Sequence, residues 1–360
     1  MPSFTSVLAL LGSASIAYGL PSARNNADPK ADNPWASLKP KTVVYFGDSY
    51  TDGGRGVYFM SGSPVPPGWD ESTSPFAKLG KKSWPDYVKQ YSGTNSHNYA
   101  MSGASCSSVL VPRKAPIPNG PKMAGVQEDE IPGFMADKAF KKDGKDFLND
   151  IDPASTVYTI WIGTNDLGAG GYLTDEQAPG KTVLDYVECV YSAFDKLYAA
   201  GGRKFILINN VPLDKTPLYT LPKGQGADQF YPTKPSDPTQ LKAANTKVGG
   251  EVKTANDAFL AKTQKDVVTK RYPGADMVVY NVHKLFEDII SSPKDYLNGT
   301  EPPNVTGVPT FSLTNLLSGK GMSSDSYLWG DALHPSEQTD RLVAKEFVNV
   351  MTGKSKYAVY

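Results

Sequence analysis

Three side chains have the types needed for nucleophilic catalysis of acyl transfer. Ser49 stands in the tetrapeptide GDSY, just after a short apolar run, where a glycine lets the backbone turn and expose the serine. A serine hydroxyl becomes a nucleophile when a neighbouring base removes its proton. His334 is the candidate base, because Asp331, three residues earlier, can hold its imidazole in the tautomer that accepts the serine proton. The spacing predicts a helical turn with both side chains on one face; a helix cap for Asp331 and a structural role for His334 are the alternatives.

Acyl transfer also needs hydrogen-bond donors for the oxyanion that forms on the carbonyl oxygen. Two positions offer such donors: Gly103, whose backbone N–H lies in the segment NYAMSGAS, and Asn165, whose side-chain amide lies in GTND. A simple turn at Gly103 and a turn or helix cap at Asn165 are the alternative interpretations.

The elements that must position these groups can be predicted from apolar runs. Residues 42–46, 156–162, 204–209 and 276–282 are short and β-rich without clean alternation, as expected of parallel strands covered on both faces. Helices are predicted over 183–197, over 241–271 with an interruption at Gly249-Gly250, and over 336–351 with Pro335 in the first turn. Alternating strands and helices indicate a single doubly wound α/β sheet, in which ligands bind at the carboxyl ends of the strands.

Together the segments GDSY, NYAMSGAS, GTND and DALHP resemble the SGNH, or GDSL-type, hydrolase family in content and order, and they span residues 43–336. The resemblance implies a flavodoxin-like three-layer sandwich with a central parallel sheet. It also implies that Ser49 is the nucleophile, that Asp331 and His334 are its partners, and that the Ser49 N–H, Gly103 and Asn165 form the oxyanion hole. Tyr50 replaces the usual leucine of the first motif, a position that does no chemistry in the family.

The extended motifs GDSYTD, NYAMSGASC, WIGTND and DALHPSEQ are most similar to those of fungal secreted acetylesterases of carbohydrate esterase family 16. This resemblance implies an enzyme that hydrolyses acetyl esters of hemicellulose-derived oligosaccharides. Aromatic faces suit sugar rings, and Trp329 and Trp69 are the aromatic residues near the motifs that we expect to bind substrate. The alternatives are a lipase or phospholipase of the same family and a carbohydrate-binding protein that has lost catalysis.

Composition and charge exclude several other classes of protein. The 37 basic and 37 acidic side chains balance, which leaves no electrostatic attraction for nucleic acid. The two cysteines are too few for a small disulfide scaffold or a cysteine-rich zinc module. No metal-ligand spacing and no glycine-rich phosphate or dinucleotide loop is present, so we expect no cofactor and no metal. We also expect no membrane anchor and a monomer.

The first residues predict the compartment. Residues 1–19 have an apolar stretch and a small-x-small ending, typical of a signal peptide. Residues 20–38 are then expected to be a flexible mature N-terminus and residues 39–360 the hydrolase domain. Secretion would permit glycosylation at the sequons of Asn298 and Asn304. It would also permit a disulfide between Cys106 and Cys189, although two separate buried thiols are an equally good interpretation.

Overall fold

The centre of the fold is a six-stranded sheet with the spatial order β2-β1-β5-β6-β7-β8. The computed structural model describes residues 33–360 except 63, 79, 81, 116–119, 226–227 and 310–323. Five strands are parallel and β8 pairs antiparallel at one edge. The sheet is formed by β1 (Thr42–Gly47), β2 (Asn95–Asn98), β5 (Thr156–Trp161), β6 (Lys204–Ile208), β7 (Asp276–Tyr280) and β8 (Ala358–Val359). Counted along the chain, the parallel strands have the flavodoxin-like order 2-1-3-4-5, which confirms the predicted fold class.

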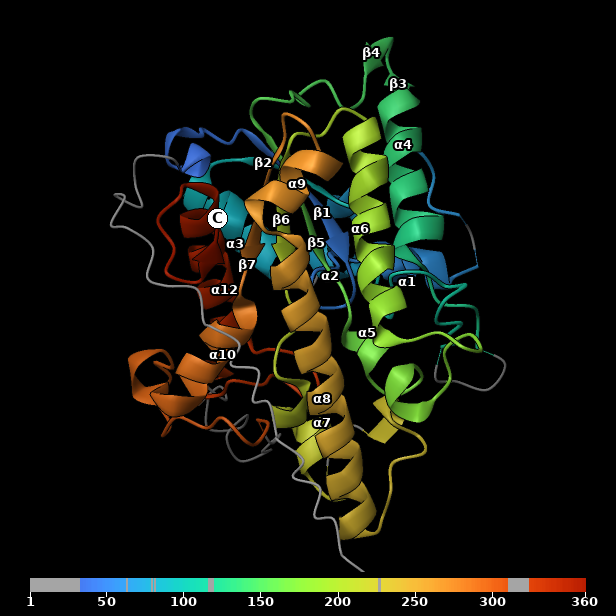
Figure 1. The fold of residues 1–360 in the computed structure, drawn as a ribbon, viewed down its shortest axis with the longest axis vertical. Coiled ribbons are helices and arrows are strands. Elements are labelled where there is room, and N and C mark those ends of the chain that lie inside the picture. The colour runs from blue at the N-terminus through green and yellow to red at the C-terminus, as the bar shows by residue number, and fades with distance from the viewer. Residues whose placement is uncertain are drawn as a thin grey trace, which may run out of the picture. The chain divides into compact units, whose positions relative to one another are not determined.

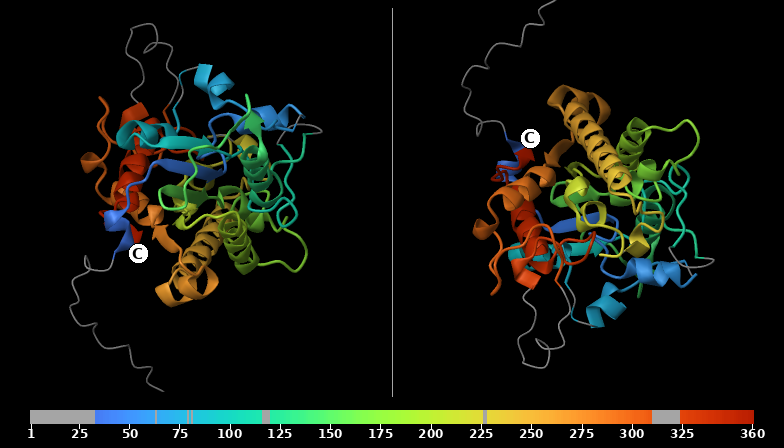
Figure 2. Two further views of the ribbon diagram at one scale, coloured as in Figure 1. Left: turned by 90° about the horizontal axis from the view of Figure 1, so that it is seen from above. Right: turned by 90° about the horizontal axis from the view of Figure 1, so that it is seen from below.

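Helices cover both faces of this sheet (Figures 1 and 2). The helices α3 and α12 pack on one face, and α4, α6 and α8 lie on the other. The helices are α1 (Arg55–Met60), α2 (Pro75–Lys78), α3 (Trp84–Ser92), α4 (Ile131–Ala139), α5 (Thr164–Leu167), α6 (Val183–Ala199), α7 (Pro217–Thr220), α8 (Pro238–Lys262), α9 (Lys265–Arg271), α10 (Val282–Ser291) and α12 (Glu337–Met351). A separate small hairpin joins β3 (Lys141–Lys142) to β4 (Lys145–Asp146).

The alternation of side chains along β1 explains the two layers. The Tyr45 ring lies 5.2 Å from that of Trp84 in α3 and 6.2 Å from that of Phe347 in α12, measured between centroids. The next ring, Phe46, lies 5.9 Å from that of Phe134 in α4, on the opposite face. Because successive side chains of a strand point to opposite faces, a central strand with two covered faces has to be apolar throughout. This is why β1 could be recognised in the sequence.

The glycine pair in the long helix does not interrupt it, so that detail of the prediction is wrong. Helix α8 runs through Gly249 and Gly250, and the break comes at Thr263, before α9 begins. A Cβ atom at Gly249 would lie 3.2 Å from the Cβ of Asp214, so this glycine permits a close approach between helix and loop. At the break, the Thr263 hydroxyl donates to the carbonyl of Phe259 over 2.7 Å.

The folded unit begins earlier than the expected boundary at residue 39. Residues Pro34–Ser37 form a short 3-10 helix, and Trp35 is 1% exposed and packed into the core. The compact unit therefore runs from Pro34 to Tyr360. The expected signal peptide at 1–19, and residues 20–32 of the expected flexible segment, lie outside the described residues.

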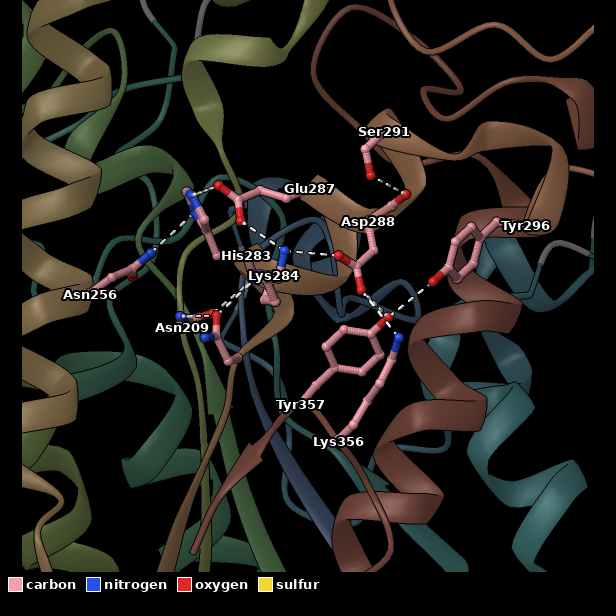
Figure 3. A network of polar contacts seen from close by, with 11 residues as sticks. Asn209, Asn256, His283, Lys284, Glu287, Asp288, Ser291, Tyr296, Lys356 and Tyr357 are labelled. Carbon is pink, nitrogen blue, oxygen red and sulfur yellow. Dashed lines mark hydrogen bonds and ion pairs between the residues drawn. The ribbon is translucent and has the colours of Figure 1, made fainter. Parts of the chain in front are cut away.

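The C-terminal strand is attached to the rest of the fold by a polar network around α10 (Figure 3). The Asp288 carboxylate accepts a hydrogen bond from the Tyr357 hydroxyl over 2.9 Å and pairs with Lys356 at 3.2 Å and with Lys284 at 2.9 Å. These contacts hold the residues just before β8 against the end of the sheet. In the described part of the chain, no helix combines the length and apolarity needed to cross a bilayer.

A disulfide joins the segment that follows β2 to helix α6. Cys106 and Cys189 are bonded to each other across 83 residues of sequence. Of the two interpretations left open by the sequence, the structure therefore has the paired one.

Candidate active site

The predicted motifs meet at the carboxyl end of the sheet because β1 and β5 are neighbours. Ser49 lies just after β1 and Asn165 just after β5. After β1 the chain adds β2 on one side and then β5 on the other, which makes this a switch point of the kind where such sheets bind ligands. A Cβ atom at Gly47 would lie 2.3 Å from the carbonyl oxygen of Trp161, so the close contact between the two strand ends requires glycine there.

The three predicted catalytic side chains form one hydrogen-bonded chain. The Oγ of Ser49 lies 2.8 Å from the Nε2 of His334. The Nδ1 of the same imidazole lies 2.9 Å and 2.8 Å from the two carboxylate oxygens of Asp331. With the Nδ1 proton held by the carboxylate, Nε2 is the ring atom that can accept the serine proton.

The Asp331–His334 segment is not the helical turn that the spacing suggested. It is a bent loop in which the Oδ1 of Asp331 accepts the backbone N–H groups of Leu333 and His334, both over 2.8 Å. The loop is closed at its base, since the N–H of Ser336 donates to the carbonyl of Leu328 over 3.0 Å. Helix α12 starts only afterwards with Ser336 as its N-cap, so Pro335 precedes the cap instead of occupying the first turn.

The charge on Asp331 is stabilised by these same contacts. Burial by itself would raise the pKa of Asp331. The hydrogen bond and the positive charge of His334, together with the two backbone N–H groups, outweigh burial and lower this pKa below its ordinary value. The carboxylate is therefore ionised when the imidazole is neutral, and it remains available to stabilise an imidazolium.

Hydrogen bonding distinguishes the backbone N–H groups of two site residues, Ser49 and Gly103, from those of their neighbours. Within the described residues, the N–H groups of Ser49 and Gly103 donate to no protein atom, whereas the N–H of Ala104 donates to Met101 and that of Tyr50 to a side chain. Gly103 has φ of +79°, and a Cβ atom there would lie 1.8 Å from the Cε of Met123. A glycine is therefore required both by the backbone conformation and by the packing.

The side chain of Asn165 contributes a third donor. Its Nδ2 donates one hydrogen to the carbonyl of Ala104 over 2.9 Å, and within the described chain the second hydrogen has no acceptor. Asn165 is 6% exposed. The bond to Ala104 fixes the amide beside the Gly103 segment.

All of these groups line one cavity of about 1430 Å³. Its walls include Ser49, His334, Gly103 and Asn165, and it extends to Trp69. This volume exceeds that of a typical small-ligand pocket. The described residues contain no group of three or more histidine, cysteine or acidic side chains arranged to hold a metal ion.

The two tryptophans predicted to bind substrate have different environments. Trp329 is 0% exposed, its Nε1 donates to the carbonyl of Val305 over 3.1 Å, and its ring packs on Phe286. It is a core residue, so the prediction for Trp329 is wrong. Trp69 is half-buried and lines the cavity, with the Arg55 guanidinium 5.1 Å from its ring centroid.

Two cavity residues were not singled out from the sequence. The ring of Phe230, on the loop between β6 and α8, lies 5.4 Å from the His334 ring, measured between centroids. The Nη1 of Arg113 donates to the carbonyl of Gly103 over 3.0 Å. The only sequence signal for either residue was its place in a long Pro/Gly-rich connection, 211–238 for Phe230 and 107–133 for Arg113.

The two glycosylation sequons also differ in environment. Asn298 is exposed. Asn304 is half-buried, and its Oδ1 accepts the backbone N–H groups of Thr306 and Gly307 over 3.0 Å and 2.8 Å. Of the two sequon asparagines, Asn298 is therefore the more exposed.

Comparison with known families agrees with the motifs. The family model described as GDSL-like lipase/acylhydrolase matches residues 43–347. The chain belongs to this family. The family predicted from the four motifs is thereby confirmed, as is the prediction of an enzyme that hydrolyses carboxylic esters.

Relatives within the GDSL-like family include two curated fungal proteins. An acetylesterase from Hypocrea jecorina is 37% identical over 330 residues, which are 89% of this chain and 91% of the relative. An acetylesterase from Thermothelomyces thermophilus is 24% identical over 329 residues, 88% of this chain and 90% of the relative. Among solved structures, an acetylxylan esterase from Geobacillus stearothermophilus aligns with a TM-score of 0.36 and 12% identity, over 88% of this chain and 96% of that one.

Proposed function

We propose that the protein is a secreted acetylesterase that removes acetyl groups from carbohydrates with Ser49 as the nucleophile. The observation that carries the proposal is the continuous chain of hydrogen bonds from Ser49 through His334 to Asp331 at the wall of a large cavity. In a hydrolase family, this arrangement of nucleophile, base and orienting carboxylate supports acyl transfer.

The reaction then follows from the positions of the protons. As the Oγ of Ser49 attacks the acetyl carbonyl carbon, its proton moves to the Nε2 of His334. The tetrahedral intermediate collapses when the imidazolium returns that proton to the departing sugar oxygen, which leaves an acetyl group on Ser49. A water molecule, deprotonated by His334, attacks this ester in the same way and releases acetate.

The oxyanion of each tetrahedral intermediate requires donors that are already in place. We assign this role to the N–H groups of Ser49 and Gly103 and to the Nδ2 of Asn165. Support comes from their hydrogen bonding, since both backbone N–H groups and one amide hydrogen lack acceptors within the described residues. Arg113 supports the same loop, because it donates to the carbonyl of Gly103.

The carbohydrate substrate is supported by the relatives and by the cavity. The two curated relatives are named acetylesterases, and the motifs resemble carbohydrate esterase family 16. Trp69 and Phe230 line the cavity, and aromatic residues suit sugar rings. We therefore infer that the substrates are acetylated oligosaccharides derived from hemicellulose.

Secretion is supported by three features of the chain. Residues 1–19 have the pattern of a signal peptide. The Cys106–Cys189 disulfide suits an oxidising compartment. The exposed Asn298 heads a glycosylation sequon, and we place a glycan there.

The decisive experiment measures acetate release from acetylated xylo-oligosaccharides and from 4-nitrophenyl acetate for the wild type and Ser49→Ala. Ser72→Ala is the matched control, because Ser72 lines the same cavity but its hydroxyl contacts Asp70. We expect Ser49→Ala to lose several orders of magnitude in rate on both substrates and the control to keep its activity. Equal rates for the wild type and Ser49→Ala would remove Ser49 from the mechanism.

Two further measurements test the alternative functions. Faster cleavage of 4-nitrophenyl decanoate than of the acetate would identify a lipase-type acylhydrolase. Binding of xylo-oligosaccharide without turnover of any ester would identify a carbohydrate-binding protein that has lost catalysis.

A further inference from the structure

The fully buried carboxyl group of Glu130 links the two backbone segments that carry the Ser49 and Gly103 N–H groups. Glu130 is 0% exposed and lies at the end of a short π-helix, η3 (Val126–Glu130). Its Oε2 accepts the backbone N–H of Gly47 over 2.9 Å, and its Oε1 accepts the backbone N–H of Met101 over 3.2 Å. A single side chain therefore joins the end of β1 to the segment that follows β2.

The two bonded residues occupy equivalent positions relative to the site. Gly47 lies two residues before Ser49, and Met101 lies two residues before Gly103. The N–H of Met101 also donates to the carbonyl of Gly47 over 3.1 Å. These bonds fix the separation between the two segments at Gly47 and Met101, two residues before the Ser49 and Gly103 N–H groups.

A second carboxylate holds the remaining residue of the loop. The Oδ2 of Asp52 accepts the N–H of Ser102 over 2.9 Å and its hydroxyl over 2.6 Å. Met101 is thus held by Glu130 and Ser102 by Asp52, and the next N–H along the chain, that of Gly103, has no acceptor in the described residues.

We propose that Glu130 is a positioning residue that sets the distance and orientation between the two backbone donors of the oxyanion hole. The proposal rests on the serine mechanism given above. Glu130 is not among the residues that line the cavity, so it acts through the backbone and does not touch the substrate. Donors fixed before the reaction stabilise the developing oxyanion without a reorganisation cost, and a buried carboxyl group whose two oxygens each accept a backbone N–H provides such fixation.

The test is Glu130→Gln, which keeps the size of the side chain but replaces one accepting oxygen by an NH2 group. That group cannot accept an N–H, so one of the two bonds is lost. Removing an oxyanion donor outright lowers kcat by about 100- to 1000-fold. For a displaced donor we expect kcat to fall by about 10- to 100-fold, with KM changed less than about twofold. Phenylboronic acid, which forms a tetrahedral adduct on a nucleophilic serine, should bind more weakly by a factor similar to the loss in kcat.

The matched control is Glu128→Gln on the same short helix. Glu128 also accepts from a neighbouring loop, the Ser107 hydroxyl over 2.6 Å and the Ser108 N–H over 2.8 Å, but it does not line the active-site cavity. We expect this variant to lose thermal stability and to keep kcat and the affinity for phenylboronic acid. Glu130→Asp is the second variant, because its shorter side chain cannot reach the N–H groups of both Gly47 and Met101 without a movement of the backbone.

Each outcome bears on the proposal separately from the serine mechanism. If Ser49→Ala is inactive while folded Glu130→Gln and Glu130→Asp have wild-type kcat, the positioning role is wrong and the mechanism stands. The same holds if Glu128→Gln loses as much kcat as Glu130→Gln, or if only KM changes. If Ser49→Ala keeps wild-type activity, the mechanism and the role of Glu130 are both overturned.

Discussion

The hydroxyl of Tyr50 donates to the backbone carbonyl of Leu333 over 2.7 Å. The residue after the proposed nucleophile is therefore bonded directly to the residue before the proposed base. The Tyr50 ring also lies edge-on to His334, with 5.7 Å between centroids. The leucine that the motif usually has at this position carries no hydroxyl, so this connection comes from the tyrosine of the present chain.

Loss of this hydroxyl should loosen the loop that carries His334. We expect Tyr50→Phe to lower kcat by about fivefold, the effect of one hydrogen bond worth about 1 kcal/mol, with little change in KM. Steady-state kinetics on 4-nitrophenyl acetate measure both constants. Tyr272→Phe is the control, since the buried Tyr272 hydroxyl also donates to a backbone carbonyl, that of Tyr191 over 3.0 Å, but Tyr272 does not line the cavity. An equal loss of kcat in both variants would contradict the prediction.

A second prediction concerns Trp69, whose ring packs against Arg55. The Arg55 guanidinium lies between two rings, 5.1 Å from the centroid of Trp69 and 4.6 Å from that of Tyr99. Arg55 thus packs on the Trp69 ring at the wall of the cavity. We expect Trp69→Ala to raise KM for acetylated xylo-oligosaccharides by about five- to tenfold, as loss of about 1 kcal/mol of aromatic contact would, and to leave 4-nitrophenyl acetate kinetics unchanged.

The contrasting variant is Trp329→Phe. Because Trp329 is buried against Phe286, we expect a lower melting temperature and an unchanged ratio of the two KM values. If Trp69→Ala impaired both substrates equally, its effect would be structural and its assignment to sugar binding would be wrong.

The sequence predicted best those features that depend on short segments. The four central strands were recognisable because both of their faces are buried, which makes them apolar throughout. Strand β2, with the polar sequence NSHN at 95–98, gave no such signal. The motif residues were found because each motif follows a strand end or lies in a compact loop.

Features that depend on contacts between distant segments could not be read in the same way. The burial of Trp329 results from its packing against α10, and no local pattern shows it. The close approach of Asp214 to Gly249 in α8 is likewise a contact between distant segments. Glu130 looks like any surface glutamate in sequence, and only the fold places it beneath the ends of β1 and β2.

The disulfide should contribute to stability more than to activity. Closing an 83-residue separation stabilises by about 2–4 kcal/mol in typical proteins. The Cys106 N–H also donates to Asp166 over 2.9 Å, a contact that persists without the disulfide. We therefore expect the double variant Cys106→Ser, Cys189→Ser to melt at lower temperature and to keep kcat within about twofold of the wild type while folded.

Reductant provides the control for this prediction. It should lower the melting temperature of the wild type to that of the double variant and have no effect on the double variant. A folded but inactive double variant would show instead that the disulfide shapes the site.

Two buried carboxyl groups near the site make the stability of the folded protein depend on pH. Burial raises the pKa of Asp48 to about 6 and that of Asp166 to about 7. Because unfolded aspartate titrates near about 3.9, the folded protein binds more protons than the unfolded chain between about pH 4 and pH 7, and the free energy of unfolding falls as pH rises through this window.

We therefore expect a higher melting temperature at pH 5 than at pH 8. Asp166→Asn should flatten the dependence of melting temperature on pH, because the amide does not titrate and its oxygen can still accept the Cys106 N–H. Asp152→Asn is the control: hydrogen bonds from the Ala154 N–H and the Ser155 hydroxyl lower the pKa of Asp152, so it titrates below the window and should leave the slope unchanged. A melting temperature that rises from pH 5 to pH 8 would mean that Asp48 and Asp166 remain ionised in the folded protein.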